Sequence, residues 1–249
     1  MALPMYDPRF YPEILFGGIP RCDGVIQFYS RVNAVVRSDS LLVDFGCGRA
    51  RHLDDPVSFR RDLRIFRGRV AKVIGLDVDP AAKDNPTIDE FRLLSVDREW
   101  PLADGSVDLI VCDSVLEHLH QPSLLFSEAQ RTLKQGGYLF VATTNAISYV
   151  GLAARLLPNR FHSRILARLQ PQRKEEDVFP TVYRCNTIPA IRKQMKQHGF
   201  RVAVFGFDAG PGYLTFSNVA YALGFLHQQL APSLIRPIIM AIGQKGFTT

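Results

Sequence analysis

The stretch from Leu41 to Arg51 constrains the chain more than any other. An apolar run over 41–45 carries one acid, Asp44, and the glycines Gly46 and Gly48 follow it at once. Such a run is typical of a buried parallel strand. The glycines let the backbone turn with positive φ and approach a ligand where a Cβ would collide. We therefore expect a strand that turns tightly into a helix.

A second apolar run, 73–76, ends at Asp77. A carboxylate at the end of a parallel strand is placed to accept hydrogen bonds from a ribose diol. Together with the glycine turn, this acid predicts a nucleotide-type site at the carboxyl edge of a parallel sheet.

The rest of the chain alternates short apolar runs with amphipathic segments, which predicts a doubly wound α/β sheet. We expect strands over 71–76, 91–96, 107–112, 138–142, 200–207 and 238–242. Helices are expected over 24–36, 122–133, 188–198 and 215–229, the second of them stopped by Gly136 and Gly137. A basic segment after the glycine turn is interpreted as a solvated helix face, formed by Arg60, Arg61, Arg64, Arg67 and Arg69.

Composition narrows the possible classes of protein and of binding partner. No apolar run approaches the roughly 18 residues of a membrane span, and the N-terminus lacks the order of an export signal, so we expect a cytoplasmic protein. The four cysteines are scattered, which argues against a disulfide or zinc framework. A net charge of +6 leaves nucleic acid, an anionic membrane face or an acidic small molecule as partners.

The segment Asp44-Phe45-Gly46-Cys47-Gly48 resembles the first motif of class I S-adenosylmethionine (SAM) dependent methyltransferases. Gly75-Leu76-Asp77-Val78 is similar to the acidic end of that family's second strand, and the resemblance covers most of 41–145. It implies a Rossmann-like, mostly parallel seven-stranded sheet with an antiparallel last strand, and SAM as cofactor. Two departures are Ala50, where the family usually has a third glycine, and a longer gap before Asp77.

The resemblance also implies a domain plan for residues 1–249 as one unit. Residues 1–40 form an N-terminal cover, 41–145 the cofactor-binding core, and 146–186 a helical acceptor lid after strand five. Residues 187–249 complete the sheet with a helical insertion.

The implied cofactor site consists of strand ends. The backbone of the glycine turn makes a partly positive nest for the methionine carboxylate, and Asp44 faces the amino group. Asp77 accepts the ribose hydroxyls, and Asp97 meets the adenine amine. The full set of expected cofactor-binding residues is Asp44, Gly46, Cys47, Gly48, Asp77, Val78, Val96, Asp97, Arg98 and Asp113.

A sulfonium methyl is already electrophilic, so the protein mainly has to align a nucleophile and exclude water. A general base is needed only for a hydroxyl or a protonated amine, and His118 is the best candidate because its ordinary pKa lies near neutrality. The alternative for His118 is a structural histidine that braces a helix. No metal site is expected, since the chain has no H-E-x-x-H or spaced carboxylate set.

Residues 146–186 break the α/β rhythm and alternate apolar and arginine positions. Three interpretations stay open for this segment: a substrate lid, an interfacial membrane helix, or a pair of surface helices. The candidate acceptor contacts are Tyr149, His162, Tyr183 and Arg184.

We conclude from sequence that the chain transfers a methyl group from SAM to a small-molecule acceptor, at oxygen, by in-line displacement. One alternative is a lipid or quinone-like acceptor at a membrane surface, with peripheral membrane contact. A second is a SAM-binding protein without turnover. DNA is not expected as a partner. In the methyltransferase family, an Asn/Asp-Pro-Pro-Tyr/Phe tetrapeptide after strand four marks enzymes that methylate amino groups of nucleic acids, and this chain lacks it. RNA is disfavoured because no RNA-binding module is visible.

Overall fold

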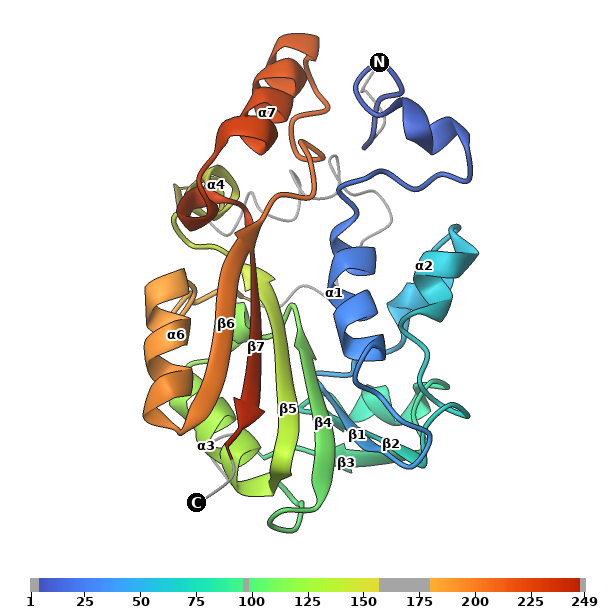
Figure 1. Cartoon of the computed structure of the whole chain (residues 1–249), viewed down its shortest axis with the longest axis vertical. Helices are drawn as coiled ribbons and strands as arrows, with labels where there is room; N and C mark the ends of the chain where they lie inside the picture. Colours follow the sequence, from blue (N-terminus) through green and yellow to red (C-terminus); the bar gives the residue numbers. More distant parts are fainter. Residues whose placement is uncertain (1–4, 96–98, 157–179, 247–249) are drawn as a thin grey trace.

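A computed structural model describes residues 5–95, 99–156 and 180–246. Its centre is a seven-stranded sheet of order β3-β2-β1-β4-β5-β7-β6 (Figure 1). The strands are β1 (Leu41–Phe45), β2 (Lys72–Asp77), β3 (Glu90–Leu93), β4 (Val107–Asp113), β5 (Leu133–Thr144), β6 (Phe200–Phe207) and β7 (Ile238–Lys245). Pairs among β1 to β5 are parallel, whereas β7 is antiparallel to both β5 and β6. The predicted sheet is confirmed, including its antiparallel last member.

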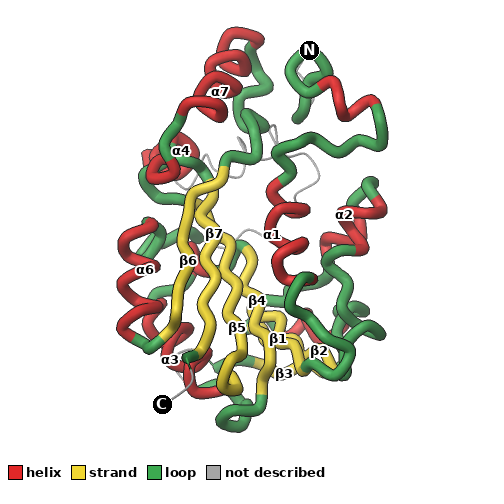
Figure 2. Tube along the Cα trace, in the orientation of Figure 1, coloured by secondary structure: helices red, strands yellow, loops and turns green. Residues whose placement is uncertain are grey.

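Helices cover both faces of this sheet (Figures 1 and 2). The α-helices are α1 (Gly24–Asn33), α2 (Ser58–Asp62), α3 (Pro122–Thr132), α4 (Tyr149–Leu156), α6 (Ile188–Gln197) and α7 (Asn218–Leu230). Short 3-10 helices are η1 (Pro12–Leu15), η2 (Arg51–Asp54), η3 (Pro80–Asp84), η4 (Leu116–His118) and η6 (Ser233–Ile235). Within the described ranges, none of the helices has the length and apolar character needed to cross a bilayer.

Two apolar clusters hold the layers together. On one face, Phe126 of α3 and Ile191 of α6 are fully buried against the sheet. On the other, Phe28 of α1 and Phe66 pack on the sheet with Leu42 and Val111. Because β1 and β4 are buried on both faces, they read as near-continuous apolar runs, which is why their positions were predictable.

The end of α3 differs from the prediction. The helix stops at Thr132, and Leu133 is already extended, with ψ of 140°. Leu133 pairs with Val107 of β4, and the register then shifts before Leu109. Gly136, with φ of +78°, lies inside this shift. The glycine therefore serves a bulge in β5 instead of ending the helix.

The N-terminal segment and α7 form one small unit. Tyr11 and Tyr221 are fully buried in a shared apolar cluster. The backbone N–H of Asp7 donates to Tyr221 Oη at 2.9 Å, and Tyr11 Oη donates to Gln228 Oε1 at 2.7 Å. We refer to residues 5–16 together with α7 as the cover.

The glycine turn after β1 can be tested by stability. Gly46 has φ of +74°, and a Cβ there would lie 2.3 Å from Val115 Cγ2, whereas a Cβ on Gly48 would meet nothing within 4 Å. We predict that Gly48→Ala costs about 1 kcal/mol of unfolding free energy, from its left-handed backbone alone. Gly46→Ala should cost about 2–4 kcal/mol, because overpacking is added. Urea unfolding measures both.

The matched control is the double variant Gly46→Ala/Val115→Ala, which removes the clashing methyl groups. It should recover part of the extra cost after correction for Val115→Ala alone. Equal costs for the two glycine variants would contradict this account of the turn.

Candidate functional site

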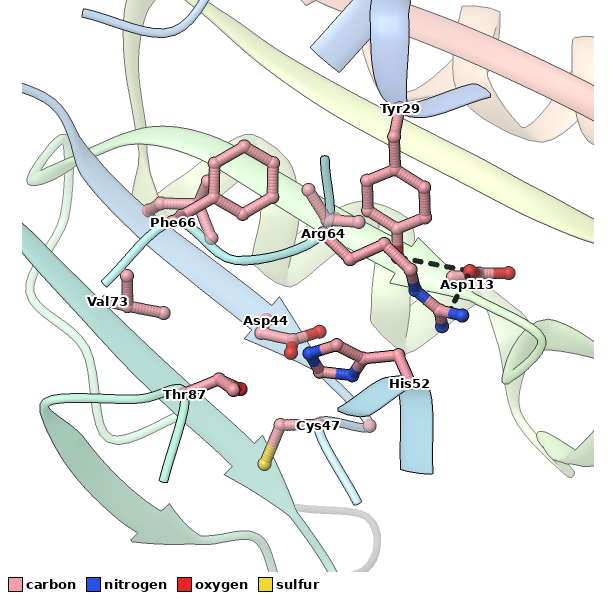
Figure 3. Close-up of a pocket in the computed structure, with 12 residues that line it drawn as sticks. Tyr29, Asp44, Cys47, His52, Arg64, Phe66, Val73, Thr87 and Asp113 are labelled. Atoms are coloured by element: carbon pink, nitrogen blue, oxygen red, sulfur yellow. Dashed lines mark hydrogen bonds and ion pairs between the residues drawn. The ribbon is translucent and has the colours of Figure 1, made fainter. Parts of the chain in front are cut away.

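A cavity of about 60 Å³ lies on one face of the sheet beside β1, β2 and β4 and reaches the ends of β1 and β4 (Figure 3). Its lining comes from the strands, from α1 and from the connection between β1 and β2, and consists of Tyr29, Leu42, Asp44, Gly46, Cys47, His52, Arg64, Phe66, Val73, Thr87, Val111 and Asp113. Four of the predicted cofactor residues are among them: Asp44, Gly46, Cys47 and Asp113. The parallel register brings these strand ends to one edge.

The turn is fastened to the end of β2. Gly46 donates its N–H to Leu76 O at 2.7 Å, and Gly48 donates to Asp77 Oδ2 at 2.8 Å. Asp77 is buried, and its Oδ1 accepts the N–H of Asp79 at 2.9 Å. A carboxylate oxygen can accept more than one hydrogen bond. Asp77 therefore shapes the turn and keeps acceptor capacity for a ligand.

Asp44 is a carboxyl group in an unfavourable environment for its charge. Burial raises its pKa to about 7, and repulsion from Asp113 and Asp77 adds to this, while the nearby Arg64 opposes it. A cationic ligand group placed beside Asp44 would remove this penalty. The site is thus electrostatically prepared for an ammonium group.

Arg64 projects into the cavity from the connection that follows α2. Its guanidinium carbon lies 5.2 Å from the centroid of the Tyr29 ring, and one of its nitrogens is 3.5 Å from Asp113 Oδ2. Tyr29 Oη donates to the same oxygen at 3.0 Å. Nε of Arg64 is buried and has no hydrogen-bond partner among the described residues. Figure 3 shows the guanidinium between Tyr29 and His52.

The prediction of a continuous solvated basic face was wrong for this segment. The helix α2 is only five residues long, so the arginines do not share one face. Arg60 pairs with Asp55 and Asp23, and Arg67 pairs with Asp89. The acids at the strand ends were the only sequence signal for a cation in the cavity. The sequence did not show which arginine provides that cation.

His52 is a second cavity residue that sequence reasoning missed. Burial lowers its pKa to about 4, with a further contribution from Arg64. Its Nε2 is buried, and no described part of the chain provides a hydrogen-bond partner for it. His52 is therefore a neutral imidazole near pH 7, and Figure 3 draws it with Asp44 among the residues that line the cavity.

His118 is oriented by a backbone carbonyl. Its Nδ1 lies 2.9 Å from Pro180 O, and a carbonyl oxygen can only accept, so Nδ1 carries the proton. In the neutral ring, Nε2 then holds the lone pair. The neighbouring Glu117 is buried, accepts Thr143 Oγ1 at 2.6 Å, and through its carbonyl binds the N–H of Val182 at 2.8 Å.

The predicted acceptor contacts are dispersed. Tyr149 of α4 packs edge-on against His227 of α7, with ring centroids 5.2 Å apart. Tyr183 donates its N–H to Glu117 O at 3.2 Å, and Arg184 is exposed. None of these three lines the cavity. His162 lies outside the described residues, as do Val96, Asp97 and Arg98.

Left-handed backbone is concentrated near this edge of the sheet. Among the described residues other than glycine, φ is positive at Ala50, Ser114 and Tyr183. Ala50 closes the glycine turn, Ser114 follows β4 directly, and Tyr183 bonds to Glu117. Such conformations cost roughly 1–2 kcal/mol each and gather at functional sites.

Val78 follows Asp77 and has half of its surface exposed, at 50%. An exposed apolar side chain beside a buried strand-end carboxylate is suited to an aromatic base lying flat on it.

Comparison with known proteins identifies the family of the chain. A family model described as a methyltransferase domain matches residues 21–203. A protein of Mycolicibacterium smegmatis, named as a probable S-adenosylmethionine-dependent methyltransferase, is 39% identical over 101 residues, 38% of each chain. The ubiquinone biosynthesis O-methyltransferase of Xanthomonas oryzae is 36% identical over 81 residues, which are 29% of this chain and 34% of that protein. The chain thus matches little more than a third of the length of these relatives.

A solved structure agrees over the whole fold. The SAM-dependent methyltransferase of Archaeoglobus fulgidus is 19% identical, with a TM-score of 0.52 over 96% of this chain and 100% of that one. At this identity the likeness concerns the fold. The family match over residues 21–203 covers most of the chain, which therefore belongs to the SAM-dependent methyltransferases and uses SAM as its cofactor.

Proposed function

We propose that the protein methylates an oxygen of a small-molecule acceptor, with His118 as general base. The observation that carries this proposal is the contact between His118 Nδ1 and Pro180 O, which leaves Nε2 as the basic nitrogen just after β4. A base is needed for a hydroxyl acceptor, whereas an unprotonated amine needs none. Because the chain belongs to the methyltransferase family, we favour an enzyme over the alternative of a SAM-binding protein without turnover.

We assign the cofactor to the edge formed by β1, β2 and β4. Asp77 would accept the ribose hydroxyls, and Val78 would lie against the adenine. Asp44 would face the amino group, which is supported by its raised pKa. The buried, unpartnered Nε of Arg64 supports a role for this arginine in binding the methionine carboxylate.

The present cavity requires a local rearrangement. Its volume of about 60 Å³ is well below the roughly 300 Å³ or more of sites for small molecules. His52 and Arg64 fill space at its centre, and both belong to the connection of short helices between β1 and β2. We infer that this connection moves outward when the cofactor enters, and that Arg64 then exchanges Asp113 for the carboxylate of the ligand.

The chemistry asked of the protein is modest. Bound SAM supplies a methyl group that is already activated on a positively charged sulfur. Tyr29 and α1 exclude water from that edge, and His118 takes the hydroxyl proton on Nε2 as the acceptor oxygen gains the methyl group. Alignment of the acceptor contributes most of the acceleration.

A lipid or quinone-like compound is the alternative to a freely diffusing small molecule as the acceptor. One relative is named for ubiquinone biosynthesis and for O-methylation. That alignment supports oxygen as the nucleophile. It covers only 29% of this chain, so the acceptor has to be identified by experiment.

We predict that the ionised carboxyl of Asp44 lowers the unfolding free energy of the ligand-free protein and strengthens SAM binding. Its folded pKa of about 7 lies above the ordinary 3.8, so the folded protein holds a proton that the unfolded chain releases. The wild-type unfolding free energy therefore falls as pH rises from about 4 to about 7 and then levels. Asp44→Asn lacks this fall, and without ligand it should be more stable at about pH 8 by on the order of 1–2 kcal/mol. Urea titrations at about pH 5 and about pH 8 test the difference.

Calorimetry of SAM binding completes the Asp44 test. An ammonium group favours ionised Asp44, so wild-type affinity should rise with pH through about 7, with release of protons. Asp44→Asn should bind roughly tenfold to a hundredfold more weakly, without that pH dependence. An unchanged pH profile in the variant would show that Asp44 does not face the amino group.

Arg64 can be tested with two ligands. Arg64→Met should weaken binding of S-adenosylhomocysteine roughly tenfold to a hundredfold, because a charge-assisted hydrogen bond is lost. Binding of 5′-methylthioadenosine, which lacks the amino-acid part, should change little. Arg67→Met is the matched control, since Arg67 pairs with Asp89 at the surface. Equal losses for both ligands would assign Arg64 to the fold instead.

His118 can be tested once an acceptor is found by mass spectrometry of metabolites that gain labelled methyl groups in a cell extract. His118→Asn should lower kcat by roughly a hundredfold or more and abolish the acid limb of the pH profile. SAM affinity should be unchanged. The exposed His120 provides the control variant His120→Asn. A His118→Asn enzyme with wild-type kcat would exclude the base assignment.

A further inference from the structure

Helix α7 presents an apolar row to solvent. Val219, Leu223, Leu226 and Leu230 are exposed by 69%, 62%, 52% and 71%. At about 100° per residue these four positions fall within roughly 60° of one another. The α7 row, as we call these residues, is a continuous stripe and not a set of scattered side chains.

The packing of α7 does not require this row. The buried residues of the helix are Tyr221, Gly224 and Gln228, which lie on the opposite side. A Cβ on Gly224 would come within 2.5 Å of Pro211 Cβ, so the inner face is already in close contact. Burying the four row residues would therefore add stabilisation that the fold does not itself use.

The surroundings of the row are also unusual for a solvated surface. Residues 209–235 contain no Asp, Glu, Lys or Arg. Further exposed apolar side chains flank the row in the same segment: Tyr213, Phe216, Leu234 and Ile235. A helix that faces only water normally carries charged residues on its outer face. Contiguous apolar surface of this kind marks an interaction site.

The same end of the molecule carries a second exposed apolar element. Figures 1 and 2 place α7 and the N-terminal segment together at one end of the sheet. In that segment Leu15 is 68% exposed and Phe16 is 86% exposed. Both parts of the cover thus carry exposed apolar side chains.

Charge decides between possible occupants. Arg9 pairs with Asp7 at 2.6 Å and donates to Asn218 Oδ1 at the start of α7 at 2.9 Å, and its side chain is 60% exposed. Arg21, at 55%, lies 3.7 Å from Glu13 beside the N-terminal apolar residues, and Arg236 follows the uncharged segment. Arginines at the rim of an uncharged apolar stripe match a bilayer with anionic headgroups. The net charge of +6 has the same sign.

We propose that the cover docks on an anionic lipid surface, with the α7 row inserted at the boundary between headgroups and acyl chains. This orientation has a consequence for the enzyme. Asn145, directly after β5, donates to the carbonyls of Leu234 and Arg236 at 2.8 and 2.9 Å, so the lipid-facing segment is tied to the cofactor edge. An acceptor held in the bilayer would enter from that side, an extension that rests on the proposed function.

The experiment is co-sedimentation of the full chain with vesicles of phosphatidylcholine, with and without phosphatidylglycerol, in the absence of SAM and acceptor. The wild type should bind the anionic vesicles, and binding should weaken as salt rises. Leu223→Asn/Leu226→Asn should bind roughly tenfold more weakly or worse. Phe59→Asn is the matched control, because Phe59 is 54% exposed on α2, away from the row.

Unchanged SAM binding shows that each variant is folded. No sedimentation of the wild type, or equal sedimentation of the row variant, would overturn the proposal. A wild type that dimerises in light scattering, with a monomeric row variant and no vesicle binding, would instead assign the row to a second copy. Vesicle binding with no methylated product from lipid extracts would keep the docking and remove only the bilayer acceptor.

Discussion

The parallel register of β1, β2 and β4 gathers Asp44, Asp77 and Asp113 at one edge of the sheet, and much of the site follows from their shared charge. Burial raises the pKa of Asp44 to about 7, and repulsion from Asp113 and Asp77 adds to this, so Asp44 is partly protonated near neutrality. Gly48 and Asp79 satisfy Asp77 through backbone N–H groups, while Arg64 approaches Asp113. In the free protein the cation at this acidic edge is therefore the guanidinium of Arg64.

This electrostatic tension links binding to stability. Ionisation of Asp44 is costly in the free protein, and the ammonium group that we propose to bind beside it would remove that cost, so part of the binding free energy would offset an existing destabilisation. The left-handed backbone at Ala50 and Ser114 belongs to the same pattern. Both features lower the stability of the free fold and are tolerated because two buried clusters hold the sheet from either side.

The sequence was informative where a single local pattern decides the structure. Apolar runs located the strands, and the glycines between Phe45 and Gly48 located the tight turn that follows β1. It was misleading where tertiary contacts decide, as at Leu133, which is drawn into β5 by its pairing with Val107. Arg64 was missed for a related reason: nothing local distinguishes an arginine that enters a cavity from one that pairs at the surface, since the difference lies in distant carboxylates.

The cover has a consequence for the order in which the protein forms. Its hydrogen bonds from Asp7 to Tyr221 and from Tyr11 to Gln228 join residues 214 and 217 positions apart. Contacts of such long sequence separation carry a high loop-closure entropy until the intervening sheet exists. On the ribosome, residues 5–16 must therefore wait for nearly the entire chain before they find their partners. The cover is therefore completed only in the last step of folding.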